Sequence, residues 1–214
     1  MIERHDSYAH YCGTPAYRRW LAQWIPPELP VTDVWHDSEV AIWDTDLTPR
    51  HHLRQRHGTR LAYHLLDSLA IQGRCVDIGC GDNGFRHRYP GIWGVDPYCE
   101  QDRDEQLTPE WWIHNWGQWP HAFSCNAMHF CPQAELPQQM AKVRGILAPG
   151  GTALVTINRQ RIQDRTPGYD RERLYHTLSH TPGLTRMVWI DSTSSGGMPD
   201  SGGMDGNVWL WINK

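Results

Sequence analysis

Hydrophobic residues occur in short runs along most of the chain, and helix-like segments separate several of these runs. Seven runs have the length and composition of strands, at residues 74–78, 91–95, 110–114, 121–126, 152–157, 184–190 and 207–212. Leucines at roughly helical spacing predict a helix at 49–70, and helices are also expected at 133–147 and 169–180. This alternation predicts an α/β fold with a mostly parallel sheet and helices on both faces.

Residues 1–48 differ in character from the rest of the chain. They are rich in tyrosine and tryptophan, and acidic residues are concentrated at 28–46. The stretch 50–60 carries four arginines and no acid, and Thr48-Pro49 is typical of a helix start. We therefore expect an aromatic-rich N-terminal extension at 1–48 that caps the core, followed by a catalytic domain at 49–214.

The length and composition suit one globular domain. The chain has 214 residues, of which 39% are hydrophobic, enough to bury a core of its own. The first residues include no apolar run typical of a signal peptide, and no segment has the roughly 20 apolar residues that a membrane span needs. We therefore expect a soluble cytoplasmic protein that does not bind membranes.

Cysteines and charge narrow the choice of ligands. The six cysteines include no Cys-x-x-Cys pair, so reduced thiols are expected. The spacing of Cys125, His129 and Cys131 matches no standard zinc site, and no metal is predicted. A net charge of −4 disfavours extended binding to nucleic acid, and a nucleic-acid acceptor stays open as an alternative.

Residues 75–98 read CVDIGCGDNGFRHRYPGIWGVDPY, and the glycine-rich turn at 79–84 fits two kinds of ligand. Its G-x-G-x-x-G spacing, with an acid 17 residues after the first glycine, also occurs in dinucleotide-binding turns. Asp77, however, places a carboxylate beside the turn, where it would repel a pyrophosphate and suit an ammonium group. Only seven residues separate the turn from the strand after it, so the helix that would face a pyrophosphate is very short.

Four segments together point to one family. VDIGCGDNG (76–84), GVDPY (94–98), AFSCNAMHF (122–130) and ILAPGGTALVTIN (146–158) resemble, in this order, the motifs of class I S-adenosylmethionine-dependent methyltransferases. The resemblance covers about residues 74–158. It implies a Rossmann-like sheet of seven strands in the order 3-2-1-4-5-7-6, with the last strand antiparallel. It also implies S-adenosyl-L-methionine as the cofactor and methyl transfer to an unidentified small or macromolecular acceptor.

The resemblance gives a cofactor-binding role to Asp77, Gly79, Cys80, Gly81, Asp96, Pro97, Asn115, Trp116 and Asn126. Glycine at 79 and 81 lets the backbone approach the cofactor closely, because a Cβ there would occupy its space. Asp77 would orient the turn and the methionine ammonium group. Asp96 would accept hydrogen bonds from the ribose hydroxyls, and the alternative for this residue is a helix N-cap before Pro97.

The remaining implied roles concern the adenine and the acceptor. Asn115 and Trp116 follow the predicted third strand and would contact the adenine, the alternative being core packing. In the loop at 126–130, beside the departing methyl group, His129 is the only side chain that titrates near neutral pH. His129 is therefore the candidate general base, the alternative being structural support of the loop. The Gly- and Ser-rich stretch 191–206 is expected to be a flexible loop that closes over the acceptor, or a solvent-exposed connection.

A methyltransferase is the leading functional hypothesis. The alternative is a non-catalytic member of the same fold that works as a binding or assembly subunit, because the first crossover at 85–91 is short. A nicotinamide oxidoreductase is a third reading of the glycine turn. The sequence does not define the oligomeric state.

Overall fold

The computed structural model describes residues 1–7, 14–22, 64, 66–69, 71, 73–81, 83–87, 89–99, 102–128, 131–158, 171–192 and 207–214. The predicted domain boundary near residue 48, most of the predicted helix 49–70 and most of the loop 191–206 lie outside these residues. His64, Leu66 and Asp67, near the end of the predicted helix, are helical. No described helix is long and apolar enough to cross a membrane.

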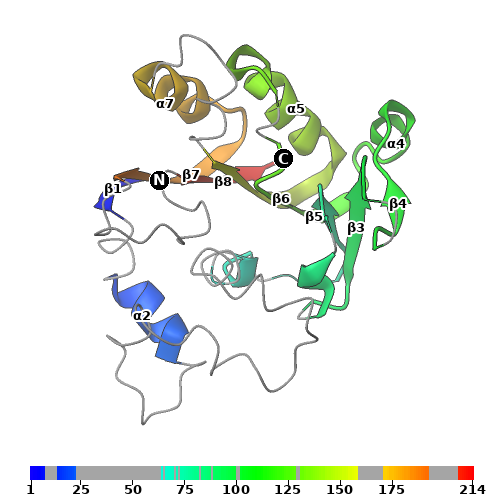
Figure 1. Ribbon diagram of the computed structural model, residues 1–214, viewed down its shortest axis with the longest axis horizontal. Coiled ribbons are helices and arrows are strands. Elements are labelled where there is room, and N and C mark those ends of the chain that lie inside the picture. Colours follow the sequence, from blue (N-terminus) through cyan, green and yellow to red (C-terminus); the bar gives the residue numbers. More distant parts are fainter. Residues whose placement is uncertain are drawn as a thin grey trace.

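Within the described residues, eight strands form one mixed sheet (Figure 1). In chain order they are β1 (Ile2–Ser7), β2 (Cys75–Ile78), β3 (Ile92–Asp96), β4 (Glu105–Gln106), β5 (Trp119–Cys125), β6 (Leu147–Asn158), β7 (Leu184–Ser192) and β8 (Asn207–Asn213). Their order across the sheet is β1-β7-β8-β6-β5-β2-β3-β4. Strand β8 runs antiparallel to both of its neighbours, and every other pair is parallel.

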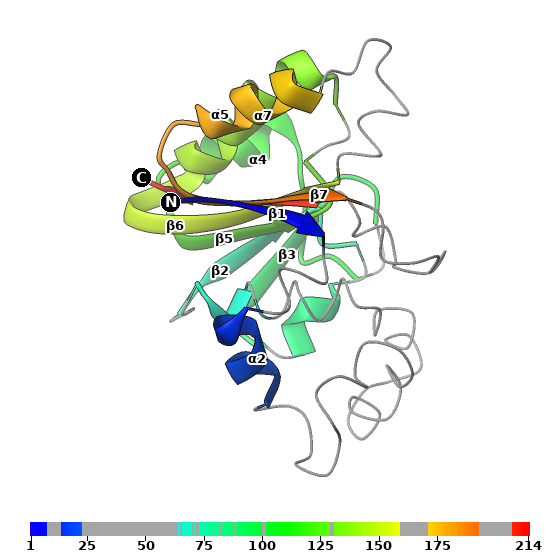
Figure 2. The same cartoon turned by 90° about the vertical axis from the view of Figure 1, so that its left-hand side faces the viewer.

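Helices lie on both sides of this sheet, as predicted. The α-helices are α2 (Pro15–Ala22), α4 (Pro109–His114), α5 (Leu136–Ile146) and α7 (Arg171–Ser179), and short 3-10 helices occur at η3 (Gly84–His87) and η4 (Gln133–Glu135). Figure 2 shows α4, α5 and α7 over one face and α2 on the other side. The predicted helices at 133–147 and 169–180 correspond to η4 with α5 and to α7. The α/β class is confirmed, and seven of the eight strands follow the predicted order 3-2-1-4-5-7-6 with the last of them antiparallel.

Two strand predictions were wrong. Residues 110–114, predicted as the third strand, belong to helix α4, because the Thr108 hydroxyl accepts a hydrogen bond from Trp111 N (3.1 Å) and Pro109 occupies the first helical turn. The two-residue strand β4 takes the third place in the sheet. The sheet also has an eighth strand, because β1 adds to β7 at the other edge.

The core lies mainly between the sheet and α5. Strand β6 is buried from Ala153 to Ile157, and α5 turns Met140, Val143 and Ile146 toward it. Spacings of three residues place these side chains on one face of the helix. Trp189 on β7 and Trp209 on β8 are fully buried, so the buried core extends into the C-terminal half of the sheet.

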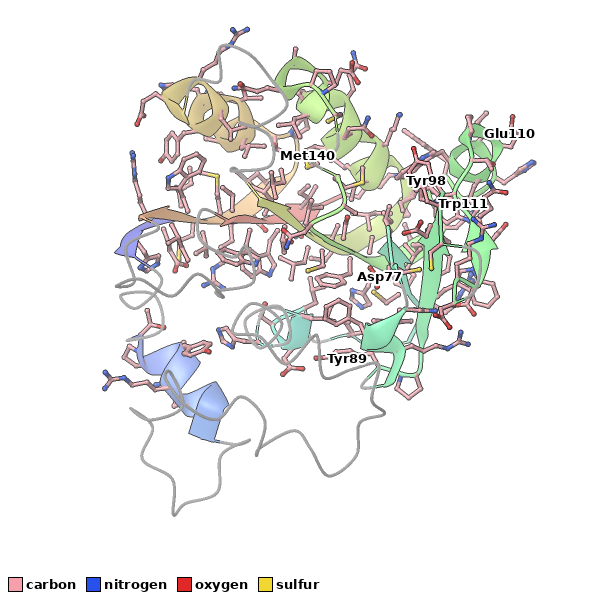
Figure 3. The ribbon with its side chains drawn as sticks, viewed as in Figure 1. Asp77, Tyr89, Tyr98, Glu110, Trp111 and Met140 are labelled. Atoms are coloured by element: carbon pink, nitrogen blue, oxygen red, sulfur yellow. The ribbon has the colours of Figure 1, made fainter. Side chains whose placement is uncertain are left out.

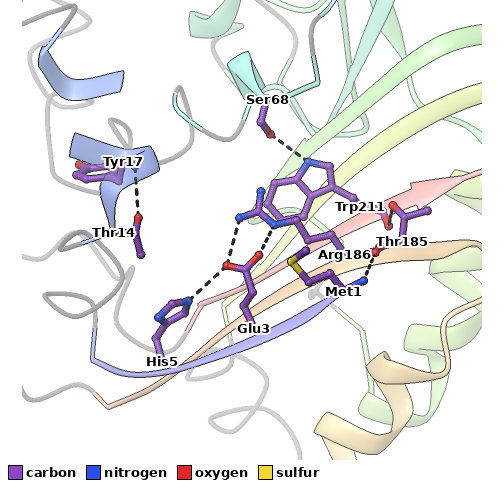
Figure 4. A network of polar contacts seen from close by, with 9 residues as sticks. All are labelled: Met1, Glu3, His5, Thr14, Tyr17, Ser68, Thr185, Arg186 and Trp211. Carbon is purple, nitrogen blue, oxygen red and sulfur yellow. Dashed lines mark hydrogen bonds and ion pairs between the residues drawn. The ribbon is translucent and has the colours of Figure 1, made fainter. Parts of the chain in front are cut away.

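Strand β1 is attached to β7 by charged groups as well as by backbone pairing (Figure 4). The Arg186 guanidinium donates hydrogen bonds to both carboxylate oxygens of Glu3, at 2.7 and 3.3 Å, and lies 4.4 Å from the Trp211 ring. Trp211 Nε1 in turn donates to Ser68 Oγ at 3.1 Å. Burial raises the pKa of Glu3, but the hydrogen bonds and charges of Arg186 and His5 outweigh burial and hold the pKa below its usual value.

Replacement of Glu3 should therefore reduce stability in a pH-dependent way. Glu3→Gln removes the charge opposite Arg186 and should lower the free energy of unfolding at pH 7 by about 1–2 kcal/mol, as measured by urea denaturation. Because the pKa of Glu3 is lowered in the folded state, its contribution is full above the ordinary carboxyl pKa and is lost as pH falls through the folded value. The difference between wild type and variant should vanish in that acidic range.

Glu172→Gln is the matched control, because Glu172 pairs with Arg4 of the same strand at 3.3 Å but has a side chain that is 62% exposed. Solvent screening should make this change nearly neutral. Equal losses in the two variants would mean that the partial burial of the Glu3 pair adds no stability.

Candidate functional site

The predicted site residues gather where three neighbouring parallel strands end. Strands β2, β3 and β5 finish at Ile78, Asp96 and Cys125, and because they are parallel these ends lie at the same edge of the sheet. The glycine turn follows β2 directly. In open α/β sheets, ligands bind outside the carboxyl ends of the strands, at the point where the order of the strands reverses.

The turn after β2 has a backbone that favours glycine and asparagine. Gly79, Gly81 and Asn83 have φ angles of 72°, 55° and 56°, in the left-handed region. The backbone N–H groups of Gly79 and Cys80 both donate to the Val95 carbonyl oxygen, at 2.7 and 3.2 Å. The turn is therefore attached to the end of β3, with its backbone folded tightly over that strand.

A second contact limits residue 79 to glycine. A Cβ built on Gly79 would overlap the Cβ of Ala127, which follows β5. The backbone of the turn after β2 therefore packs directly against the Ala127 side chain in the loop after β5. Buried Ser124 supports the same junction, because its hydroxyl donates to the Ile78 carbonyl oxygen at 2.9 Å.

Asp96 joins the turn to the segment after β3. One of its carboxylate oxygens accepts from Gly81 N at 3.1 Å, and the other accepts from Tyr98 N and Cys99 N at 2.7 and 2.8 Å. Pro97, which follows Asp96, is half-buried at the same edge. The contacts with Tyr98 N and Cys99 N have the hydrogen-bond pattern of an N-cap, the alternative for Asp96, but residues 97–99 are not helical.

Asp77 lies beneath the turn and is 1% exposed (Figure 3). It pairs in register with Gly94 of β3 and Phe123 of β5, so these residues share one face of the sheet. Phe85 of η3 covers that face through an edge-on contact with Phe123, with ring centroids 4.9 Å apart. The carboxylate therefore sits in an enclosed layer between the sheet and the first crossover.

The thiol of Cys80 is kept protonated by this environment. Burial raises the pKa of Cys80 to about 12, and the negative charges of Asp77 and Asp96 add to the effect. The Cys80 Sγ lies 3.6 Å from the Gly81 carbonyl oxygen, within sulfur hydrogen-bond range. Cys80 is therefore part of the turn rather than a nucleophile.

Asn126 also has a left-handed backbone, with φ 55°, directly after β5. Its N–H donates to Thr156 Oγ1 at 2.9 Å, and the Thr156 hydroxyl donates to Asn126 Oδ1 at 3.1 Å. Because Thr156 belongs to β6, Asn126 is held between two neighbouring strand ends beside Ala127. His129, the candidate base, lies outside the described residues.

Asn115 and Trp116 are not brought to this edge. Asn115 caps the end of α4, and its Nδ2 donates to the Trp111 carbonyl oxygen at 2.9 Å. Trp116 packs against Gly145 in the last turn of α5, where a Cβ would overlap the indole ring. Since α5 leads directly into the first residue of β6, this contact lies at the opposite, amino edge of the sheet. The structure thus separates these two residues from the glycine turn.

Arg103 and Asp104 belong to none of the motifs that predict the site, although both contact it. Arg103 Nη1 donates to the Asp96 carbonyl oxygen at 3.0 Å, and Asp104 accepts from Asn83 Nδ2 at 3.1 Å. The available signal was the charged run DRDE at 102–105 in the short link between the second and third strands. Within the described part of the chain, no cluster of His, Cys, Asp or Glu could hold a metal ion.

Comparisons with solved structures support the same fold. No protein-family model and no curated protein matches this sequence. A SAM-dependent methyltransferase from Archaeoglobus fulgidus is similar with a TM-score of 0.50 and 12% identity, over 73% of this chain and 92% of the other. The N-methyltransferase NodS from Bradyrhizobium japonicum WM9, in complex with S-adenosyl-L-homocysteine, gives a TM-score of 0.53 and 11% identity, over 86% and 95%. The chain therefore has the class I SAM-dependent methyltransferase fold.

The close approach at Gly79 can be tested by adding one methyl group. Gly79→Ala should cost the left-handed backbone penalty of roughly 1–2 kcal/mol and a further roughly 1–3 kcal/mol for the overlap with Ala127. The measurement is the free energy of unfolding in urea.

Gly150→Ala is the matched control for this change. Gly150 has φ 76°, but a Cβ there would meet nothing within 4 Å, so only the backbone penalty applies. If both variants lost the same stability, the turn and the loop after β5 would not be in close contact.

Proposed function

We propose that this protein is an S-adenosyl-L-methionine-dependent methyltransferase with an acceptor still to be identified. The observation that carries the proposal is the bridge from Asp96 to Gly81 across the ends of β2 and β3. It brings together an acid and a left-handed glycine turn, each at the position that the family resemblance assigns to it. The fold similarity to known methyltransferases supports the proposal at the level of architecture.

The free hydrogen-bonding capacity of Asp96 suits a ribose. A carboxylate has about four acceptor positions, and the described residues fill three of them with backbone N–H groups. The remaining position can accept a ribose hydroxyl, while the three N–H bonds fix the carboxylate in place. Gly79, Cys80 and Gly81 would lie along the methionine part of the cofactor, with Asp77 orienting the ammonium group.

The corrected strand assignment also changes the proposed adenine contact. The family places this contact after the third strand, and the third strand is β4 rather than 110–114. We therefore assign the adenine contact to half-buried Leu107, which directly follows β4, in place of Asn115 and Trp116. Asn126 would line the cofactor on the side of β5.

The chemistry asked of the protein is mainly alignment. Bound S-adenosylmethionine supplies an electrophilic methyl group, which the acceptor attacks in line with the departing sulfur. The glycine turn, Asp96 and Asn126 would hold the cofactor at the strand ends. His129 would take a proton from an acceptor that carries one, such as a hydroxyl or an ammonium group.

The cellular setting proposed for this activity is the cytoplasm. All five cysteines within the described residues are free, which suits a reducing compartment. The acceptor is a small molecule or a macromolecular group, without involvement of a membrane.

A binding subunit of the same fold is the second candidate. The observation in its favour is η3, a 3-10 helix of only four residues where the glycine turn leads into the first crossover. A helix this short has only a small dipole, so it would stabilise the carboxylate of a bound cofactor only weakly. The binding subunit would have the same cofactor-site geometry as the methyltransferase but would not transfer a methyl group.

Cofactor binding is the first test. Calorimetry with S-adenosyl-L-homocysteine should show micromolar binding to wild type, and Asp96→Ala should weaken it by about 1–3 kcal/mol, the scale for hydrogen bonds to a charged acceptor. Glu110→Gln, on exposed α4, is the control and should bind as wild type does. Absence of binding to wild type would remove the methyltransferase proposal, and an unaffected, folded Asp96→Ala would remove the ribose role.

The role of His129 needs a transfer assay. Radiolabelled S-adenosylmethionine and fractionated cell extract should reveal an acceptor, and His129→Asn should lower transfer by about 10²–10⁴-fold while leaving S-adenosyl-L-homocysteine affinity within about twofold. His114→Asn, on exposed α4, is the control. Cofactor binding without transfer to any fraction would favour the binding subunit.

A further inference from the structure

A single carboxylate connects three parts of the chain around the glycine turn. Asp104 Oδ2 accepts hydrogen bonds from Asn83 Nδ2 at 3.1 Å and from Gly94 N at 2.8 Å. Its other oxygen forms an ion pair with the guanidinium of Arg86 in η3. Asp104 therefore links the last part of the turn, the first crossover and β3.

The contact with Asn83 holds an otherwise strained residue. Asn83 has φ 56° and is 5% exposed, and its carboxamide lies flat over β3 where a Cβ on Gly94 would be only 2.5 Å away. A carboxylate only accepts hydrogen bonds, so the amide nitrogen of Asn83 must face Asp104. The amide oxygen is buried without a hydrogen-bond partner among the described residues, so the described contacts hold the carboxamide through its nitrogen.

The backbone of Asp104 and its neighbour extend the same attachment. Asp104 N donates to the Gly94 carbonyl oxygen at 2.8 Å, so residue 104 pairs with β3 through both its main chain and its side chain. Arg103 Nη1 donates to the Asp96 carbonyl oxygen. Residues 103–104, which we term the clasp, thus hold both segments of the proposed cofactor site: the glycine turn through Asn83, and Asp96 through its carbonyl.

Two features of the fold make such a support necessary. Strand β4 pairs with only two residues of β3, Val95 and Asp96. The pairing therefore does not reach Gly94, and the Gly94 N–H donates to the Asp104 side chain instead. The turn also leads into η3, whose four residues form about one 3-10 turn and provide little rigid structure behind it. The link between β3 and β4 has no helix in its described residues, 97–99 and 102–104.

We propose that the clasp positions the glycine turn for cofactor binding, with Asp104 and Asn83 as positioning residues that act through Gly81 and Asp96. This inference rests on the proposed function for its ligand, but the effect of the clasp on the turn can be measured in the free protein without any ligand. If Asp104 is removed, Asn83 loses its described partner and the Gly81 N–H loses its fixed alignment with Asp96.

The experiment uses two readouts on the full chain. Hydrogen exchange of the free protein measures the exchange rates of the turn at 79–84 and of the strand end at 94–96. Calorimetry measures the affinity for S-adenosyl-L-homocysteine, at a temperature well below the unfolding midpoint of each variant. Asp104→Ala should raise exchange in these two segments by about tenfold or more and weaken affinity by a similar factor. Exchange in peptides of β6 and β8 should stay unchanged.

Two further variants separate positioning from general stabilisation. Asn83→Gly removes the carboxamide but tolerates the left-handed backbone, so it should reproduce most of the effect without added strain. The double variant should be no weaker in affinity than Asp104→Ala alone, because both residues act through one contact. Arg86→Met removes only the ion pair on the exposed side of Asp104 and should change both readouts by less than about threefold.

The outcomes distinguish this proposal from the proposed function. The proposal would be overturned if the turn of Asp104→Ala or Asn83→Gly exchanged at the wild-type rate. It would also be overturned if exchange rose uniformly over the whole sheet. Unchanged affinity in both variants alongside normal binding by wild type would also overturn it. If wild type binds no S-adenosyl-L-homocysteine but exchange still rises locally in the variants, the ligand assignment fails and the structural role of the clasp stands. Should Asp104→Ala fail to fold, Asn83→Gly decides both readouts.

Discussion

The hydrogen bonding between β2 and β3 continues beyond the end of β2, and the whole candidate site depends on this continuation. After Ile78 the chain leaves the sheet, yet the next two N–H groups still donate to Val95, the residue that β3 pairs with Ile78. The backbone meets this condition with Gly79 in the left-handed region, at a position where a Cβ would overlap Ala127. The glycine-rich sequence is thus a requirement of the packing before any ligand is considered.

Much of the fold could be predicted because its signals are local. The glycine turn is read from a few neighbouring residues and marks the end of β2 correctly, whereas the Pro-Gly-Gly run at 149–151 lies inside β6. The third strand was predicted wrongly because residues 110–114, with two tryptophans, have strand-like composition. Thr108-Pro109 is a helix-start signal of the same kind as Thr48-Pro49, and in α4 this signal outweighs the composition.

The parts that could not be predicted depend on contacts between distant residues. Apart from Ile2, strand β1 consists of polar and charged residues, and it is a strand because it pairs with β7, more than 180 residues away. The placement of Asn115 and Trp116 followed from the wrong third strand, so one local error moved two site residues across the sheet. The sequence around Asp104 shows only a charged run. The role of this loop carboxylate depends on its neighbours in space, Asn83, Gly94 and Arg86, which are distant in the sequence.

A sulfonium cofactor is an alkylating agent, and a thiolate beside it would compete with any acceptor for the methyl group. Cys80 sits in the middle of the turn proposed to hold that cofactor, yet burial, with the charges of Asp77, Asp96 and Asp104 in addition, raises its pKa to about 12. At neutral pH the raised pKa lowers the thiolate fraction, already small for an ordinary thiol, still further. Burial, together with the acids that suit the turn to an ammonium group and a ribose, would thus also limit methylation of the protein's own sulfur.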